Sequence, residues 1–293
     1  MTYHAGSRAV QDRVGVRGIA DHQGQAVGQG IRPVAAAFLE RQPMLVLGAA
    51  DPASGAVWAS LLTGEPGFVR ATGPHRISVV GGVGAGDPLA TALRAPDTPV
   101  GTIALDPRTR RRMRLNGRAR PTVRGFAVEA DQVFSNCPKY LQRRESYETV
   151  DRASTTARRG HELTPEQREF IESSDTFFLA TVHEHGADAS HRGGNPGFVR
   201  AASPHELSWR DYPGNSMFLT LGNLSVDPRA GLLFLDWVSG SVLQLTGTAH
   251  TEFDQDGERT VRFIVAEVVE TPAASPLTWT APEYSAANPE PAR

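Results

Sequence analysis

The sequence predicts a mainly β protein in which one antiparallel barrel domain occurs twice. The first observation behind this prediction is a repeat: GEPGFVRATGPHRISV at 64–79 returns as GNPGFVRAASPHELSW at 194–209, an offset of 130 positions (194 − 64 = 130). The second is that each copy consists of short β-rich runs separated by turn residues, with few helical patterns. The third is that the offset holds over roughly 60 residues, which chance similarity between turns does not produce. Outside the two segments, residues that match at this offset are Ser60 and Ser190, Asp97 and Asp227, Gly101 and Gly231, Leu105 and Leu235, Asp106 and Asp236, Leu115 and Leu245, Gly117 and Gly247, and Ala119 and Ala249.

Each copy is expected to begin with an amphipathic helix. In the first copy this helix is VAAAFLERQ at 34–42, and in the second it is TPEQREFIESS at 164–174. Thr164 supplies an N-cap hydroxyl, Pro165 suits the first helical position, and Gln167 completes a capping box. The second helix therefore carries an explicit start signal.

Strands are expected to follow each helix in the same order. The runs, with the first copy before the second, are MLVLGA and FFLATV, VWASLL and ADASHR, GFVRA in both, and RISVV and ELSW. A hairpin follows in each copy, VGTIALD…RRMRLNGRA and AGLLFLD…SVLQLTGTA, and VSGS supplies the turn of the second. The last strand, RTVRFIVAEVVE at 259–270, places Val261, Phe263 and Val265 on one face because side chains alternate along a strand.

The glycine-rich stretch ISVVGGVGAGDPLATAL at 77–93 is similar to the start of a dinucleotide-binding fold. Its spacing does not fit, because Gly82 and Gly84 require a third glycine at position 87, where Asp87 stands. The aligned segment of the second copy, WRDYPGNSMFLTLGNL at 209–224, is expected to be a loop and has no such fingerprint. The glycines are therefore expected to form a flexible connection.

Composition argues against several classes of protein. The 293 residues are 40% hydrophobic and carry a net charge of −2, so no overall positive field favours nucleic acid or an anionic membrane. The basic run RTRRRMR at 108–114 is expected to be a solvated hairpin rim, with a phosphate or partner site as the alternative. The sequence contains no run of about 18 apolar residues, so no membrane span is predicted. The first residues, MTYHAGSRAVQDRVG, lack the apolar middle of a secretory signal. A single cysteine suits a reducing compartment, so we expect a cytoplasmic protein.

We expect no metal site. The histidines of VHEHG at 182–186 lack the i, i+4 spacing of a helical zinc site and are expected to face solvent at a strand end. Cys137, within NCPKY, is expected to be buried near an interface as a small apolar group, with a reactive thiol as the alternative.

The first candidate ligand segment is SHRGGNPGF at 190–198. Arg192 offers a planar fork of donors that suits a phosphate, and Ser190 adds a hydroxyl. Gly193 and Gly194 allow a ligand to approach the backbone closely. The first copy has SLLTGEPGF here, which keeps the turn glycine and lacks the His–Arg pair. Both copies need a glycine for the same turn, but only the second copy carries the charged group. The His–Arg pair therefore indicates a function beyond forming the turn.

The second candidate segment is DYPGNSMFLTLGNLSVDPRAG at 211–231. Asn215, Thr220 and Asn223 could present amide and hydroxyl groups to a ligand there. The alternative is a run of turns in which Asn and Gly take positive φ angles. Trp209, directly before the loop, is the tryptophan best placed to stack on a ligand, whereas the others are expected in the core or at an interface.

The runs SHRGGNPGFVR, DYPGNSMFLTLGNLSVDPRAGLLFLD and LQLTGTA resemble the pyridoxamine 5′-phosphate oxidase-like FMN-binding split barrels. In the first half, YHAGSRAVQDRVG, VWASLLTGEPGF and FSNCPKYLQRR are similar to the tandem-barrel flavin-nucleotide-binding subgroup of that family. The resemblance implies two tandem antiparallel split β-barrels with short helices, which form a pseudo-dimer within one chain and hold FMN in the cleft between them. The expected organisation is an N-terminal extension (1–32) that is mobile unless it docks, barrel one (33–135), a bridging segment (136–163), barrel two (164–270) and an extended tail (271–293).

The resemblance also implies one principal flavin per chain, because diverged copies can keep one cleft and lose the other. Ser190, His191 and Arg192 would hold the phosphate, Thr220 and Asn223 would lie near the ring or ribityl chain, and barrel one with the bridging segment would close over the cofactor. The expected cofactor-binding residues are Ser190, His191, Arg192, Gly193, Gly194, Trp209, Asn215, Thr220, Asn223, Asn136, Lys139, Tyr140 and Arg143, with Arg144 beside them.

The activity implied is that of an FMN-dependent oxidoreductase acting on a small molecule, in which the isoalloxazine carries the chemistry. His191 and Tyr140 are candidate proton donors, with structural roles as the alternative. The tail PEYSAANPEPAR has no equivalent of the arginine segment that grips pyridoxamine phosphate, so oxidation of vitamin B6 is not expected. No cysteine cluster is present for an iron–sulfur module, so electrons would come from a separate NAD(P)H-dependent reductase. The chain would act as a pseudo-dimeric monomer or a homodimer. The alternative is a non-catalytic protein of this fold that binds flavin, haem or deazaflavin.

Overall fold

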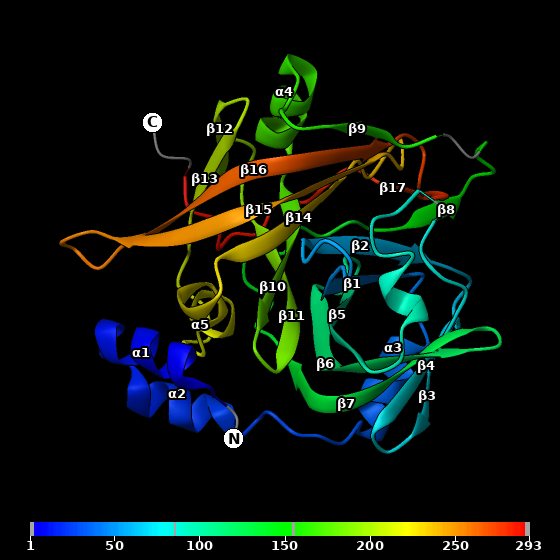
Figure 1. The fold of residues 1–293 in the computed structure, drawn as a ribbon, viewed down its shortest axis with the longest axis horizontal. Coiled ribbons are helices and arrows are strands. Elements are labelled where there is room, and N and C mark those ends of the chain that lie inside the picture. The colour runs from blue at the N-terminus through cyan, green and yellow to red at the C-terminus, as the bar shows by residue number, and fades with distance from the viewer. Residues whose placement is uncertain (1–2, 85, 154–155, 291–293) are drawn as a thin grey trace.

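Two antiparallel sheets, one in each half of the chain, dominate the computed structural model, which describes residues 3–84, 86–153 and 156–290 (Figure 1). The first sheet comprises β1 (Met44–Ala50), β2 (Val57–Thr63), β3 (Val69–Gly73), β4 (Arg76–Val80), β5 (Thr98–Asp106), β6 (Arg111–Thr122) and β7 (Gly125–Ser135). The second comprises β9 (Arg158–Gly160), β10 (Thr176–His183), β11 (Gly186–Gly193), β12 (Val199–Ser203), β13 (Glu206–Arg210), β14 (Arg229–Leu235), β15 (Val242–Phe253) and β16 (Arg259–Thr271).

The two sheets have the same topology. The first has the strand order β2-β1-β5-β6-β7-β4-β3, and the second has β11-β10-β14-β15-β16-β13-β12 with β9 added beside β16. Matching β1 with β10, β2 with β11 and so on makes the two orders identical. The predicted mainly β fold of two tandem antiparallel units is therefore confirmed, and we call the units barrel one and barrel two.

The two barrels also share an irregularity of register. The pairing of β6 with β7 shifts between Asn116 and Gly117, and that of β15 with β16 shifts between Thr246 and Gly247. A β-bulge bends a strand and increases its local twist, so its position belongs to the fold. Recurrence of the shift at equivalent positions supports duplication of the whole domain.

Five α-helices and one 3₁₀ turn accompany the sheets in the described part of the chain: α1 (Ala5–Val14), α2 (Arg17–Gly24), α3 (Pro33–Leu39), η1 (Ala92–Arg94), α4 (Pro165–Ser173) and α5 (Leu219–Val226). The predicted capping box of α4 is present, because the Gln167 N–H donates to Thr164 Oγ1 at 3.2 Å and the Thr164 N–H donates to Gln167 Oε1 at 3.0 Å. The expected loop at 209–224 was wrong in its second half, where α5 forms. This helix is buried between barrel two and α1, so it lacks the polar face by which helices are recognised in sequence.

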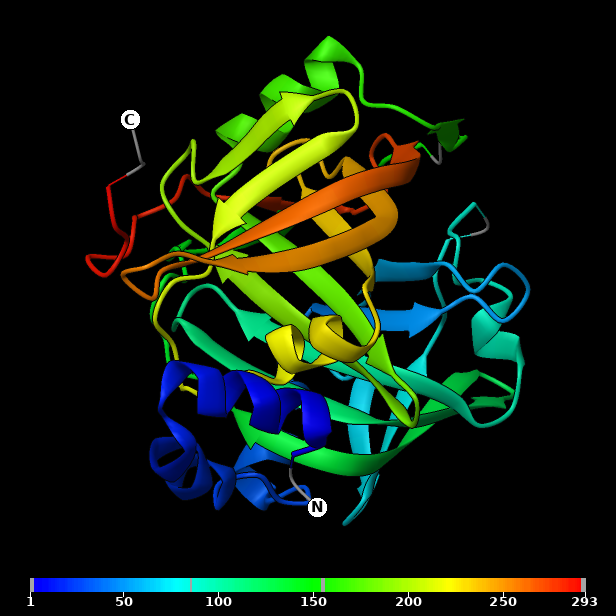
Figure 2. The same ribbon diagram turned by 60° about the vertical axis from the view of Figure 1, so that its left-hand side comes forward.

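The N-terminal extension is docked on the barrels. The Gly6 N–H donates to Nδ1 of His4 at 3.1 Å, which caps α1, and Gly15 ends this helix in the left-handed region at φ 74°. Figure 2 shows α1 lying beside α5, with α2 on the other side of α1. Further along, Gly28 exchanges backbone hydrogen bonds with Val133 of β7, so the extension reaches both barrels.

The barrels meet along a close-packed apolar interface. One cluster of buried side chains takes residues from both halves, including Val46, Val57, Phe178 and Leu233. Two equivalent glycines lie at this interface: a Cβ on Gly101 would come within 2.4 Å of Asp188 Cα, and one on Gly231 within 2.6 Å of Trp58 Cα. The backbones of β5 and β14 therefore approach the opposite barrel too closely for any side chain.

The tail runs along the bridging segment. Its strand β17 (Leu277–Trp279) pairs with β8 (Tyr147–Thr149), and Glu283 exchanges backbone hydrogen bonds with Arg143. Helices long and apolar enough to cross a bilayer are absent from the residues that the structure describes.

Candidate functional site

A pocket opens between the barrels and takes its walls from both. Barrel one contributes β5, β6 and the segment that follows β7, and barrel two contributes β11, β13 and the loop leading into α5. Strand β6 of barrel one contacts β11 of barrel two, so side chains at the ends of these two strands converge here. The pocket is therefore a property of the paired barrels.

Arg112 and Arg114 of β6 and Arg192 of β11 bring three guanidinium groups into this pocket. Arg112 and Arg114 occupy alternate positions of one strand, so both point to the same side. The expectation that RTRRRMR forms a solvated rim was wrong at these two residues, because Arg114 is only 6% exposed and Arg112 is half-buried.

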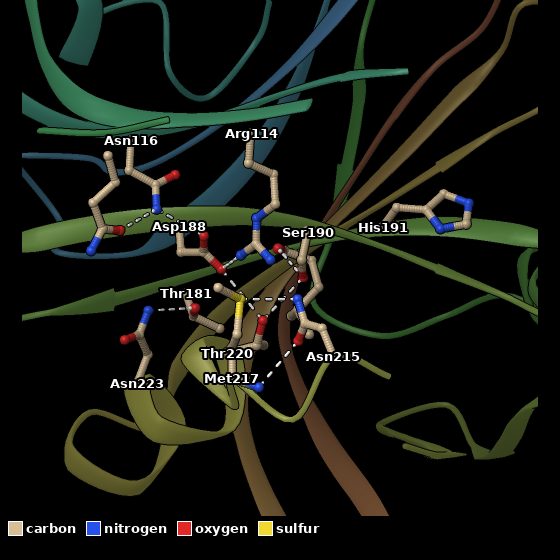
Figure 3. A network of polar contacts seen from close by, with 12 residues as sticks. Arg114, Asn116, Thr181, Asp188, Ser190, His191, Asn215, Met217, Thr220 and Asn223 are labelled. Atoms are coloured by element: carbon tan, nitrogen blue, oxygen red, sulfur yellow. Dashed lines mark hydrogen bonds and ion pairs between the residues drawn. The ribbon is translucent and has the colours of Figure 1, made fainter. Parts of the chain in front are cut away.

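Arg114 belongs to a buried polar network (Figure 3). It forms an ion pair with Asp188 of β11, and Asn116 donates to the other Asp188 oxygen at 3.0 Å. Thr220 lies 3.4 Å from the Asp188 carboxylate and 3.2 Å from the hydroxyl of Ser190. The negative charge of Asp188 is thus matched by Arg114, and the network orders the pocket wall.

Arg112 has no carboxylate among its hydrogen-bond partners in the described structure. Its Nη1 donates to Nδ1 of His191 at 2.6 Å, and its Nη2 donates to the carbonyl of Cys137 at 2.7 Å. Burial and the nearby charges of Arg192 and Arg114 lower the pKa of Arg112 to about 9, which leaves it charged at neutral pH. A partly buried cation paired with neutral groups favours an anionic ligand.

His191 is held neutral, and its tautomer is fixed. Because arginine only donates, Nδ1 of His191 accepts from Arg112 and the ring hydrogen lies on Nε2. Burial lowers the pKa of His191 well below its usual value, and the charges of Arg112 and Arg192 add to this effect. In Figure 3 the ring lies apart from the Asp188 network. His191 therefore presents a permanent donor.

Arg192 is the predicted phosphate ligand, and it does line the pocket. Its Nη1 donates to Ser190 Oγ at 3.3 Å, and its Nη2 lies 3.6 Å from Asp211. Asp211 also accepts from Arg259 at 3.2 Å, so one carboxylate is shared by two guanidiniums. Burial lowers the pKa of Arg192. The cations of the pocket therefore outweigh their counter-ions.

Several buried polar atoms of the pocket have no hydrogen-bond partner among the described residues. They are Nε of Arg112, Arg114 and Arg192, Nε2 of His191, Nε1 of Trp209 and Oδ1 of Asn136. A buried polar group without a partner is costly, and native proteins seldom leave several in one place. Five of these six atoms are donors, so the residues present fit a ligand rich in acceptor oxygens.

Tyr140 lies at the mouth of the pocket, in the left-handed region at φ 63°. Its hydroxyl donates to the carbonyl of Pro213 at 2.9 Å, and its ring centroid is 5.1 Å from that of Tyr212. Partial burial raises the pKa of Tyr140. Lys139 and Cys137 lie beside it and are exposed, so the expectation that Cys137 is buried was wrong.

The structure brings together most of the residues that the sequence singles out. Ser190, His191, Arg192, Gly193, Trp209, Asn215, Thr220, Asn136, Lys139 and Tyr140 all line the pocket. Gly193 is required by packing, because a Cβ there would lie 2.1 Å from the Tyr140 carbonyl. Asn215 turns its amide inward on the loop, where Oδ1 accepts from the Met217 N–H at 3.2 Å.

Four predicted residues lie outside the pocket wall, and one of them, Arg144, pairs with the buried Asp175 at 2.9 Å. Asn223 is buried beneath α1, where its amide donates to Thr181 at 2.9 Å. Gly194 packs against Phe198, and Arg143 pairs with Glu283 of the tail at 2.9 Å. The expected role of Asn223 near the ring or ribityl chain is therefore not supported by its position.

Asp188 was missed as a site residue, and Arg112 and Arg114 were included only in the alternative interpretation of 108–114 as a phosphate or partner site. The signal that reveals them is the comparison between copies that singled out Arg192, because the equivalents of Arg112 and Arg114 at the 130-residue offset are Val242 and Gln244. A run of arginines looks like a surface feature until that comparison is made.

The equivalent cleft on the other side of the interface is occupied by the side chain of Asp87, and we call it the closed cleft. There Ser60, Leu62, Val242 and Gln244 stand where the pocket has Ser190, Arg192, Arg112 and Arg114. The carboxylate of Asp87 fills the space, because it accepts from Ser60 at 2.6 Å and from Gln244 at 3.0 Å. Burial raises the pKa of Asp87. The first copy thus carries an internal carboxylate beside the counterparts of Ser190 and Arg114.

Comparison with known proteins gives the following. A model of the family described as pyridoxamine 5′-phosphate oxidase matches residues 163–280, whereas no curated protein matched the chain. Among solved structures, a Lactobacillus delbrueckii protein proposed to be a pyridoxamine 5′-phosphate oxidase has 19% identity and a TM-score of 0.31, over 36% of this chain and 93% of its own. An FAD-binding protein from Mesorhizobium loti has 10% identity and a TM-score of 0.31, over 40% and 99% of the two chains. One from Mycobacterium smegmatis has 10% identity and a TM-score of 0.29, over 38% and 97%. The resemblance of the second half of the chain to the pyridoxamine 5′-phosphate oxidase-like split-barrel proteins is confirmed over residues 163–280.

Proposed function

We propose that the pocket between the barrels binds FMN and that the protein is a flavin-dependent oxidoreductase acting on a small molecule. The observation that carries the proposal is Arg112, a guanidinium that, among the residues the structure describes, donates only to an imidazole and to carbonyls, and that lies beside Arg192 and Arg114. A phosphate would supply the missing negative charge and accept from several donors at once. Flavin also fits the family whose model matches the second barrel, and two of the solved structures that are similar to this chain are FAD-binding proteins.

In this proposal one group of residues binds the phosphate, and a second group supplies neutral hydrogen-bond donors. Arg112, Arg192 and the hydroxyl of Ser190 would hold the phosphate, and the Nε2 hydrogen of His191 would add a neutral donor. Trp209 would contribute its indole N–H, which is buried and has no partner in the described structure. Bound flavin supplies hydride or electron transfer, and the protein's own part is to orient it and limit access of water. Reducing equivalents would come from a separate NAD(P)H-dependent reductase.

One flavin per chain follows from the asymmetry of the two clefts. In the other cleft, uncharged Val242 and Leu62 stand at the positions of Arg112 and Arg192. The Asp87 carboxylate there would repel a phosphate. A single ligand is therefore expected for each pseudo-dimeric chain.

The test compares FMN with riboflavin, which lacks the phosphate. Arg192→Ala should weaken FMN binding about 10- to 100-fold, as loss of a charge-assisted contact does, and should leave riboflavin binding nearly unchanged. Arg200→Ala, which removes an exposed arginine of β12, is the matched control. Equal FMN retention by Arg192→Ala and wild type would overturn the phosphate assignment, and a wild type that binds neither compound would overturn the flavin.

A second candidate is a flavin-binding protein without turnover. It is favoured by the state of the two expected proton donors, because burial and the charge of Arg112 keep His191 neutral and the Tyr140 hydroxyl donates to Pro213. Bleaching of the bound flavin by NADH or NADPH with an added reductase, followed by substrate-dependent reoxidation, would support the oxidoreductase. A flavin that stays oxidised with every donor would support the binding protein.

A further inference from the structure

Helix α1 lies directly on α5, although about 200 residues separate them in the chain (Figure 2). The helices touch at two glycines. A Cβ on Gly6 would lie 2.3 Å from the carbonyl of Gly222, and one on Gly222 would lie 2.4 Å from Ser7 Oγ. Contact this close requires small residues on both helices. The N-terminal helix is therefore fitted to α5.

Gln11 connects α1 to the loop that forms one wall of the pocket. Its side chain is fully buried, and its Nε2 donates to the carbonyl of Met217 at 2.8 Å. The N–H of Met217 in turn donates to Asn215 Oδ1, and both residues line the pocket. The amide of Gln11 thus holds the backbone of a pocket residue from behind.

The loop needs such support because its backbone is strained. Ser216 and Phe218 take φ angles of 59° and 52°, in the left-handed region that residues other than glycine seldom occupy. Conformations of this kind persist only where the surrounding structure fixes them. Thr220, whose hydroxyl donates to that of Ser190, comes two residues after Phe218. The loop therefore also sets the position of the Thr220 hydroxyl.

The extension reaches the pocket from barrel one as well. Tyr3 and Ala20 share an apolar cluster with Met217 and with Phe134 of β7. The ring of Phe134 carries the Arg114 guanidinium 5.0 Å from its centroid. Contacts of the N-terminal segment therefore lead to both the loop and the arginine wall.

We propose that α1 is a positioning element of the ligand pocket, in which Gln11 fixes the Met217 carbonyl and so holds loop 211–218 in its ligand-binding conformation. The proposal rests on the proposed function for the identity of the ligand, FMN. It gives the N-terminal extension a role at the site without any contact between α1 and the cofactor.

The test is Gln11→Leu, which keeps approximate size and removes the donor. Its matched control is Gln23→Leu, which makes the same change at an exposed position of α2. Gln11→Leu should raise the dissociation constant for FMN about tenfold, mainly through faster release, and should quicken hydrogen exchange at 211–221 in the protein without FMN. Gln23→Leu should do neither. Gln11→Glu, which retains shape but places an acceptor against the carbonyl, should reproduce both effects if the leucine variant does not fold.

The two readouts separate the failures. A wild type that binds no FMN contradicts the proposed function, whereas accelerated exchange at 211–221 in Gln11→Leu still supports the loop assignment. Unchanged exchange and unchanged FMN release in folded Gln11 variants would overturn the role of α1. General destabilisation would instead quicken exchange throughout barrel two, and that outcome would also overturn it.

Discussion

Nη1 of Arg112 lies 2.6 Å from Nδ1 of His191, so a guanidinium of barrel one fixes the tautomer of an imidazole in barrel two. The pair spans the interface between the duplicated domains. It also turns a residue that commonly transfers protons into a fixed donor, because Nδ1 is occupied and the ring stays neutral. The pocket chemistry therefore depends on the two barrels being held together.

The first prediction concerns His191 and pH. A histidine whose folded pKa is lowered takes up its proton more readily when unfolded, so wild type should lose stability as pH falls through about 6.5. The groups that face its ring are Arg112 and Arg192, both cationic, and the apolar Phe178. His191→Gln should lack this part of the pH dependence, whereas His205→Gln, at an exposed position, should retain it.

Nitrogen NMR on the ring provides the direct check. The unprotonated nitrogen of His191 should be Nδ1, and its titration midpoint should lie well below the ordinary histidine value of about 6.5. A protonated Nδ1, or a midpoint near the ordinary histidine value, would contradict the tautomer assigned here.

The second prediction is that Arg112→Val separates stability from ligand binding. Valine is the residue at the equivalent position of the closed cleft, Val242. Replacing a poorly compensated, partly buried cation by an apolar residue is often neutral or stabilising, so the melting temperature without FMN should hold or rise. FMN affinity should fall about 10- to 100-fold. Arg111→Val, at the exposed neighbouring position, is the control, and parallel loss of stability and affinity would argue against a ligand-directed role.

The third prediction is a stoichiometry of one FMN per chain. Asp87→Asn should not add a second site, because Leu62 and Val242 still leave that cleft without cations. Titration calorimetry with absorbance at the flavin band gives the number directly. Two molecules of FMN per wild-type chain would mean that the Asp87 cleft is open after all.

Asp87 also yields a fourth prediction, on the direction of a pH effect. Burial raises its pKa, so the folded state favours the protonated carboxyl, and wild type loses stability as pH rises from about 4 through the folded pKa. The difference in unfolding free energy between Asp87→Asn and wild type should therefore move in favour of the variant over this range. A difference that is constant with pH would show that the carboxylate is fully compensated by Ser60 and Gln244.

The sequence predicts the fold well and the site only in part, for identifiable reasons. The repeat keeps register through both barrels, so the sheet order of one half fixes that of the other. Ser190, His191 and Arg192 could be found because their neighbours are glycines and their counterparts are uncharged. The burial of Arg112 and Arg114 depends on the approach of β11 from the opposite barrel, and the amino-acid composition does not indicate that contact. The role of Gln11 likewise depends on docking over 206 residues of sequence separation.

The last prediction uses the pseudo-symmetry of the interface. Gly101→Ala and Gly231→Ala should each lower stability by about 1–3 kcal/mol, as overpacking does, because each new Cβ meets backbone of the opposite barrel. Gly82→Ala, in open space, is the control. The two variants should differ in FMN binding. Gly101 lies against Asp188, so its substitution displaces the partner of Arg114 and weakens binding, whereas Gly231 lies against Trp58 on the side of the closed cleft. Equal effects of both substitutions on FMN affinity would show that the two clefts are not functionally distinct.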